Sequence, residues 1–333
     1  MNQTIETPHA LYSASSLDRL AICPISARLS EGVVIPSGEA AQRGTRIHAL
    51  AEGLLNNEPA IEYDQEEMNI AQDYVSFVKG MLGDGDLYVE VNLENALQKY
   101  NPNFGGTADA VIRNNATLDV IDLKTGTAHV TAKENRQLLT YGLGALGTLG
   151  WEGVETVRLH IWQPGNTHSV EYPIARLHSW EIELTEIGER ADDPFAKAVP
   201  TAKGCYYCKG KAKCDALRDK AMEAAKQDFS ENNLEKLLDD AELVGLWVDA
   251  VKSQGKTLLA GGADGGHWGL KPGRKMTSWT DIFAVEDYFA GNPKAFEIKS
   301  IAQIKKLGLE IPEQFIEVKE SAPSLTRKSG ELG

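Results

Sequence analysis

GGTADAVIRNNATLDVIDLKTG, residues 105–126, is the stretch that decides the fold. Residues 105–114 and 117–126 have the apolar and β-branched character of strands, and the pair Asn114-Asn115 between them is typical of a tight turn. Residues 87–93, LYVEVNL, form a similar pattern before a turn at Asn101-Pro102. The sequence therefore predicts three consecutive strands of one sheet.

Three reactive side chains lie on the last two of these strands. Asp109 belongs to the first of the two, and Asp122 and Lys124 stand two residues apart on the second, so their side chains point to the same face. Two carboxylates and one lysine at adjoining strand ends suit a Mg²⁺ or Mn²⁺ site beside a phosphate. A simpler interpretation also fits, namely a turn aspartate and an exposed Asp-x-Lys pair on an edge strand.

Helices are expected before and after these strands. Apolar periodicity predicts three earlier helices, at residues 13–30, 39–56 and 66–82. Pro24 follows Cys23 directly, so we expect a kink or a new helix start there. The pattern then predicts a helix at 135–150, a hairpin of strands at 156–165 and 167–174, and a helix at 179–195. This order indicates an α/β protein with a small mixed sheet flanked by helices.

The character of the chain changes after about residue 226. Residues 234–261 have the pattern of a long amphipathic helix, and residues 267–281 that of a short hairpin. Short helices are expected at 282–290 and 300–307, and a disordered tail at 321–333. We therefore expect a domain at 1–226, a helical and hairpin extension at 227–320, and the tail.

Basic and aromatic residues alternate within this extension. Trp268, Arg274, Lys275 and Trp279 would suit a surface for single-stranded nucleic acid, on which bases stack. A small core of tryptophans with surface cations explains the same residues and is the slightly favoured interpretation.

The composition is that of a globular protein. The chain has 333 residues, of which 42% are hydrophobic and 25% are charged. No stretch approaches the roughly 18 apolar residues of a membrane span. The opening residues, MNQTIETPHALYSASS, lack the basic head and apolar core of a signal peptide, so we expect a cytoplasmic protein and no membrane partner. The net charge of −14 argues mildly against a nucleic-acid partner.

All four cysteines of the chain have a pattern of metal ligands. Cys205, Cys208 and Cys214 follow a C-x2-C-x5-C spacing, and Cys23 stands about 180 residues earlier. Thiols of a cytosolic protein stay reduced, and clustered ones more often bind metal than form disulfides. With Cys23 as the fourth ligand, such a centre would staple the start of the domain to its end.

Lysines and arginines surround the cysteine cluster. The basic strip of residues 203–226 contains seven of them against three acids: Lys203, Lys209, Lys211, Lys213, Arg218, Lys220 and Lys226. Charge alone does not distinguish a solvated helix face from a phosphate-binding surface, although local potential matters more than net charge for phosphate contact.

The order of the pieces is more informative than any single piece. His48 lies in a G-x-x-x-H helix segment, and Gln137 and Tyr141 lie four apart on one helix face. The chain contains six motifs in a fixed order: a cysteine, a helix with a histidine, a strand with an aspartate, a strand with Asp-x-Lys, a helix with Gln-x3-Tyr, and C-x2-C-x5-C. Together they resemble the RecB-like branch of the PD-(D/E)XK nuclease superfamily, and within it the iron–sulfur nucleases such as the AddB nuclease domain and the CRISPR-associated adaptation exonucleases. The resemblance covers residues 13–220.

The resemblance implies a restriction-endonuclease-like core and a role for each residue. His48, Asp109 and Asp122 would hold Mg²⁺ or Mn²⁺, Lys124 would be the catalytic lysine, and Gln137 and Tyr141 would support the site. The second acid is Asp where many relatives have Glu. Glu90 is a further acidic candidate. The four ligands of a four-iron four-sulfur cluster would be Cys23, Cys205, Cys208 and Cys214, with zinc as the alternative occupant because four thiolates suit it equally.

The function implied is metal-dependent exonuclease activity on DNA ends, preferably single-stranded. The C-terminal region resembles a family of uncharacterised bacteriophage proteins, which suggests a role in phage DNA replication or recombination, with partners from those processes, in the host cytoplasm. Two alternatives are a non-catalytic DNA-binding or scaffold component and a zinc-stapled structural protein. Cleavage polarity, exonuclease or endonuclease action, DNA or RNA preference, metal number and oligomeric state stay open.

Overall fold

The computed structural model describes residues 10–35, 38–58 and 63–270. The chain separates into two compact units, Met1–Leu270 and Lys271–Gly333. All described residues belong to the first unit, and the domain boundary expected at residue 226 falls inside it. Arg274, Lys275, Trp279, the short helices expected at 282–290 and 300–307 and the expected tail lie outside the described residues.

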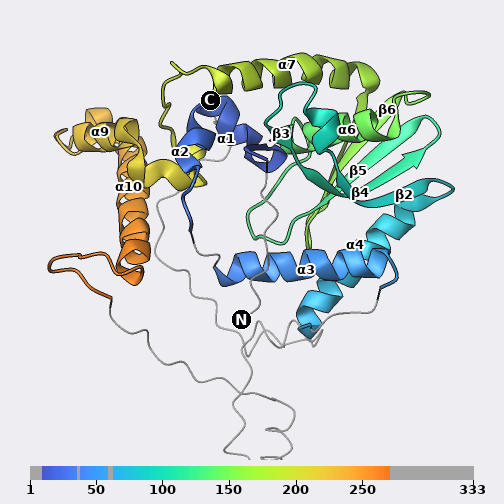
Figure 1. The fold of residues 1–333 in the computed structure, drawn as a ribbon, viewed down its shortest axis with the longest axis horizontal. Helices are drawn as coiled ribbons and strands as arrows, with labels where there is room; N and C mark the ends of the chain where they lie inside the picture. The colour runs from blue at the N-terminus through green and yellow to red at the C-terminus, as the bar shows by residue number, and fades with distance from the viewer. Residues whose placement is uncertain (1–9, 36–37, 59–62, 271–333) are drawn as a thin grey trace, which may run out of the picture. The chain divides into compact units, whose positions relative to one another are not determined.

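A five-stranded mixed sheet forms the centre of the first unit (Figure 1). In spatial order its strands are β2 (Asp86–Asn92), β4 (Thr107–Asn114), β5 (Thr117–Leu123), β6 (Thr156–Trp162) and β7 (His168–Pro173). All neighbours are antiparallel except β5 and β6, which run parallel. The expectation of a mixed α/β architecture is confirmed.

The turn between β4 and β5 fixes the register of the two strands that carry the acids. Asn114 pairs with Thr117, which leaves a two-residue loop. Asn115 has a φ of 39°, in the left-handed region that asparagine tolerates well. The parallel step from β5 to β6 requires a crossover, which α6 (Arg136–Leu149) provides.

Helices cover both faces of the sheet (Figure 1). On one face, α3 (Glu39–Leu55) and α4 (Gln65–Leu82) bury Ile47, Tyr74 and Val78 against Ile112 and Ile121 of the strands. On the other face, α6 and α7 (Ile174–Asp192) pack on Val111, Val120 and Leu159 with residues such as Leu138 and Trp180. β2, β4, β5 and β6 therefore contribute to two separate cores, and their ends remain available for a site.

The boundaries of α7 differ from the expected helix at 179–195. The helix begins five residues earlier, because Pro173 ends β7 in an extended conformation and serves as the N-cap. It ends at Asp192 because Asp193 precedes Pro194, which disfavours helical geometry at the residue before it.

The N-terminal segment is broken where the sequence suggested. The helix expected at 13–30 consists of a 3₁₀ turn η1 (Ala14–Ser16), α1 (Leu17–Ile22) and α2 (Ser26–Ser30). Cys23 lies between α1 and α2 with φ −126° and ψ 95°, as a residue before proline requires. A short strand β1 (Tyr12–Ser13) pairs with β3 (Phe104–Gly105) and ties this segment to the sheet region.

The segment after residue 200 contains several short elements that the sequence analysis did not anticipate. They are α8 (Ala202–Tyr206), η2 (Lys209–Lys213), α9 (Asp215–Ala224) and η3 (Glu231–Asn233), followed by the expected long helix α10 (Leu234–Ala260). The four-residue helix α5 (Glu94–Leu97) was likewise not expected. α10 packs on α9 and η2, and η2 packs on α2, so the late segment lies against the N-terminal one. Among the described residues, no helix combines the length and apolar character that a membrane crossing demands.

Candidate active site and cysteine cavity

Three side chains from three different elements converge at the ends of β2 and β4. His48 comes from α3, Glu90 from β2 and Asp109 from β4, and one potential ligand atom of each lies within 4.8 Å of the others. His48 Nδ1 is 3.4 Å from Asp109 Oδ1. The backbone N–H of Leu123 donates to Asp109 Oδ2 over 2.7 Å, which fixes the carboxylate and leaves Oδ1 toward the histidine. A nitrogen and several carboxylate oxygens at this spacing are a donor set that Mg²⁺ or Mn²⁺ accepts.

Glu90 reaches this group through an unusual backbone conformation. Its neighbours Val89 and Val91 pair with Ala110 and Ala108 in a regular antiparallel ladder, but Glu90 itself has a φ of 48°. A non-glycine residue in the left-handed region inside a strand is strained by roughly 1–3 kcal/mol. Such strain is concentrated at functional sites, where the surrounding structure holds it in place.

A second group of side chains forms one hydrogen-bonded network. Lys124 Nζ lies 2.7 Å from Asp122 Oδ2 and donates to Gln137 Oε1 over 3.1 Å. Gln137 Nε2 donates to Asp122 Oδ1 over 3.2 Å and to the Tyr141 hydroxyl over 2.8 Å. The network therefore holds the lysine between a carboxylate and an amide, with the tyrosine as the inner support.

Asp122 retains an unused hydrogen-bonding position. Its side chain is 3% exposed, and its Oδ2 has the ion pair to Lys124 but no hydrogen bond of good geometry among the described residues. A buried carboxylate oxygen with spare acceptor capacity fits a site that receives a cation or a water.

Negative charge is concentrated at this end of the sheet. Burial raises the pKa of Asp122 to about 6, the Lys124 ammonium opposes that shift, and the Asp109 charge reinforces it. Burial also raises the pKa of Glu90 to about 7, with Asp109 and Glu52 adding to the effect. Both shifts come first from burial, and the nearby Asp109 carboxylate adds to each of them.

His48 responds to the same charges in the opposite direction. Burial by itself lowers the pKa of His48, but the hydrogen bond and charge of Asp109, with the charges of Asp122 and Glu90, outweigh it and raise the pKa. The raised pKa of His48 therefore reflects the three carboxylates that surround it.

The structure brings together every residue that the sequence analysis assigned to the catalytic centre, in two adjoining groups. His48 and Asp109 lie in the group with ligand spacing, whereas Asp122 lies in the lysine network. Glu90, considered only as an extra acid from the sequence, completes the first group. The sequence placed Glu90 on the strand LYVEVNL, but neither its register against Asp109 nor its positive φ could be predicted from the sequence.

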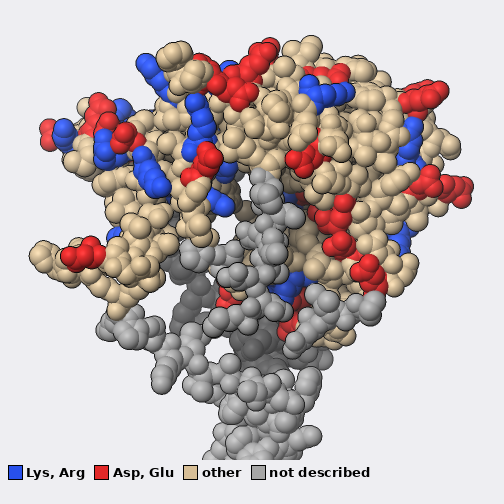
Figure 2. Space-filling model, viewed as in Figure 1, with Lys and Arg blue, Asp and Glu red and all other residues tan. Residues whose placement is uncertain are grey.

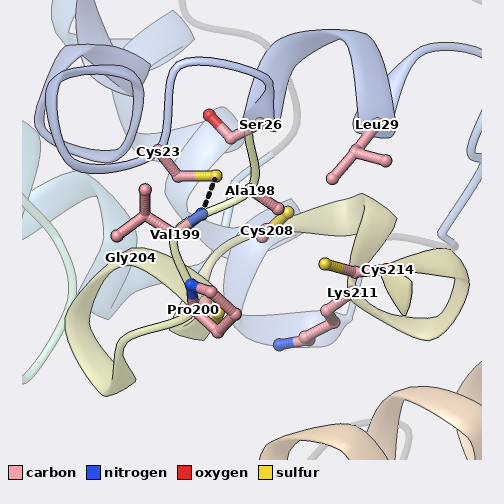
Figure 3. Close-up of a pocket in the computed structure, with 11 residues that line it drawn as sticks. Cys23, Ser26, Leu29, Ala198, Val199, Pro200, Gly204, Cys208, Lys211 and Cys214 are labelled. Atoms are coloured by element: carbon pink, nitrogen blue, oxygen red, sulfur yellow. Dashed lines mark hydrogen bonds between the residues drawn. The ribbon is translucent and has the colours of Figure 1, made fainter. Parts of the chain in front are cut away.

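The four cysteines line one small cavity (Figure 3). All are free and buried. Cys23 comes from the break between α1 and α2, and Cys205 belongs to α8, while Cys208 and Cys214 precede η2 and α9. The amide of Val199 donates to Cys23 Sγ over 3.4 Å. Burial raises the pKa of Cys205 to about 11, and the neighbouring cysteines add to this shift.

Comparisons with known proteins identify one family and several similar solved structures, two of which are described below. The family model described as "Protein of unknown function (DUF2800)" matches residues 9–329. The structure titled "Crystal structure of SSO0001" is similar over 65% of this chain and 89% of its own, at 16% identity and a TM-score of 0.33. An alkaline exonuclease (LHK-Exo) from Laribacter hongkongensis is similar over 55% of this chain and 91% of its own, at 10% identity and a TM-score of 0.26. Both structural similarities are weak.

Proposed function

Because the chain belongs to the DUF2800 family, whose description assigns no function, we propose from the geometry of the site that it is a metal-dependent nuclease that hydrolyses DNA. The observation that carries this proposal is that two groups lie side by side, joined by the hydrogen bond from the Leu123 amide, between Asp122 and Lys124, to Asp109. A ligand set of His48, Glu90 and Asp109 adjoins a buried Asp122–Lys124 ion pair that Gln137 orients.

The residues present fit a hard divalent cation. His48, Glu90 and Asp109 would hold it, and the buried Oδ2 of Asp122 offers a further oxygen from the next strand. A bound Mg²⁺ or Mn²⁺ would supply polarisation of a phosphoryl oxygen and a lowered pKa of a bound water.

Lys124 would act on the phosphate directly. Its side chain is 27% exposed, so the ammonium is open to a substrate while Asp122 and Gln137 fix its position. A fixed cation in a partly desolvated site stabilises the negative charge that develops on the phosphoryl group. Gln137 and Tyr141 do not need to touch the substrate for this role, because they hold the lysine and the acid in place.

Cations beside the cysteine cavity support DNA as the substrate. Lys203, Lys209 and Lys213 are exposed, and Figure 2 shows lysine and arginine side chains gathered over the part of the molecule that holds the cysteine segment and α9. Clustered cations supply most of the sequence-independent affinity for nucleic acid. Action at DNA ends, a preference for single strands and a role in phage replication or recombination stay predictions from the family resemblance.

We assign the cysteine cavity to a four-iron four-sulfur cluster rather than to zinc. The support is the convergence of four buried, free thiols from distant parts of the chain on one cavity, together with the resemblance of the motif order to iron–sulfur nucleases. The cluster would have a structural role, because it joins the N-terminal segment to the segment that carries the exposed lysines.

A cleavage assay on end-labelled single- and double-stranded DNA tests the proposed function. Wild-type protein should degrade DNA with Mg²⁺ or Mn²⁺ and not with EDTA, and Asp109→Asn should lose the activity while keeping the circular dichroism of the wild type. The end that loses label gives the polarity. If cluster-loaded wild-type protein binds DNA but never cleaves it, the non-catalytic scaffold function replaces the nuclease.

A further inference from the structure

A second cavity, of about 450 Å³, adjoins the candidate active site. Its walls come from four places: the N-terminal halves of α3 and α4, the loop after β5 and the loop after β6. The volume lies within the range of about 300–1,000 Å³ that small-molecule sites occupy. Neither the catalytic network nor the cysteine cavity includes the residues that line it.

Chain connectivity places this cavity beside the catalytic groups. Thr125 and Gly126 line it and directly follow Lys124. Arg43 lines it from α3, five residues before His48. Gly44 brings the helix and the loop together, because a Cβ at this position would lie 2.9 Å from Thr125 Oγ1. A ligand that fills the cavity is therefore a close neighbour of whatever binds at Lys124.

The wall opposite α3 is held in shape by a buried amide. Gln163 is 5% exposed, and its Nε2 donates to the carbonyl oxygens of Gly126 and Ala128. Its Oε1 accepts from Asn166 Nδ2 over 3.3 Å. These bonds join the loop after β5 to the loop after β6, so the cavity exists before any ligand arrives.

The lining combines one ion pair, Arg43 with Glu66, with apolar and neutral polar groups. Arg43 Nη2 lies 3.4 Å from Glu66 Oε1, and its side chain is 32% exposed. Ile70 and Pro164 provide apolar surface, and Thr125 and His129 provide hydrogen-bonding groups. A guanidinium suits phosphate, and an apolar wall with polar edges suits a nucleobase.

We propose that this cavity is a subsite for one nucleotide of the substrate strand, next to the phosphate that is cleaved. Arg43 binds the phosphate of that nucleotide, and Glu66 competes for the same guanidinium. The proposal rests on the proposed nuclease function for the identity of the substrate, but DNA binding tests it independently of cleavage.

Two substitutions in the ion pair of Arg43 and Glu66 test the proposal, because they should change DNA affinity in opposite directions. Arg43→Gln removes the phosphate contact and should weaken binding of a short fluorescein-labelled single-stranded oligonucleotide about tenfold. Glu66→Gln releases Arg43 and removes a negative charge, so it should tighten binding two- to threefold or so. Glu183→Gln removes a carboxylate of another arginine pair, on α7, and should leave affinity unchanged. Fluorescence anisotropy in EDTA measures each dissociation constant without cleavage.

Opposite shifts for the two variants support the subsite. If Arg43 served only to pair with Glu66, both substitutions would change affinity in the same direction or not at all, and the subsite would be excluded. Failure of wild-type protein to bind the oligonucleotide would also exclude it. Opposite shifts in a protein that shows no cleavage with metal would retain the subsite and remove the nuclease function instead.

Discussion

At the scale of one residue, Glu90 has a conformation that suits the candidate site but destabilises the fold. The carboxylate completes the group with His48 and Asp109 only because the backbone at this position has a φ of 48°. In addition, burial and the charge of Asp109 raise its pKa to about 7. Backbone strain and unbalanced charge both destabilise the metal-free protein, so the residue is explained better by a ligand than by the fold.

Replacing Glu90 by glycine and by alanine separates these two effects. Both variants lose the carboxylate and should lose Mn²⁺ binding. Glycine adopts a positive φ without steric cost, so Glu90→Gly should be more stable than Glu90→Ala by about 1 kcal/mol. Urea unfolding measures the difference. At an ordinary strand position the order is reversed, and a more stable alanine variant would mean that the left-handed backbone is not present.

The raised pKa of Glu90 predicts a pH dependence in EDTA. The folded protein binds this proton more tightly than the unfolded chain, whose glutamates titrate near 4.5. Stability should therefore fall as the pH rises from about 4.5 to about 7, and Mn²⁺ should oppose the fall. Urea unfolding of wild-type protein and Glu90→Gln across this range checks it. If the free energy of unfolding changed with pH in the same way for both proteins, the buried and charged environment assigned to Glu90 would be wrong.

At the scale of the element, helices and strands that local sequence patterns specify were predicted, and those that depend on tertiary contacts were not. Alternating patterns predicted the strands of the sheet, and Pro24 predicted the break between α1 and α2, because both signals are local. The short elements α8, η2 and α9 were missed, since tertiary packing rather than periodicity specifies them. The start of α7 was missed because Pro173 ends a strand and caps a helix at the same time.

Gly210 offers a test of how η2 packs on α2. A Cβ at this position would overlap the backbone of Leu29, so Gly210→Ala should displace η2 and reduce the metal content of the cysteine cavity. Gly245 of α10 has open space around its Cα, and Gly245→Ala should raise stability by about 1 kcal/mol with unchanged metal content. Metal analysis and thermal unfolding of both variants compare the two glycines. Full metal loading of Gly210→Ala would show that this close contact is not needed.

At the scale of the whole molecule, the cysteine cavity joins positions about 180 residues apart. Closing so long a loop removes conformational entropy from the unfolded chain. The sequence predicted that the four cysteines would lie together, because the C-x2-C-x5-C spacing is typical of metal ligands and Cys23 supplies a fourth thiol. It did not predict their spacing, which depends on how η2 and α9 pack.

Cys23→Ser should therefore lower stability and remove the bound group together. Protein purified without oxygen should be brown with broad visible absorption, and the variant should be colourless with a lower temperature of thermal unfolding. Absorption spectra and iron and zinc analysis decide the occupant. Colourless wild-type protein with one zinc per chain would overturn the iron–sulfur assignment.

The central claim is that Lys124 and the adjoining acids cleave DNA, and the rate of cleavage by Lys124→Ala tests it most directly. Under single-turnover conditions with Mn²⁺, removing the ammonium should slow cleavage by about 100-fold or more, because the developing charge on the phosphate loses its fixed cation. Lys99→Ala, a change at an exposed lysine paired with Glu181, should keep the wild-type rate, and circular dichroism should match in all three proteins. A folded Lys124→Ala variant that cleaves at the wild-type rate would contradict the account.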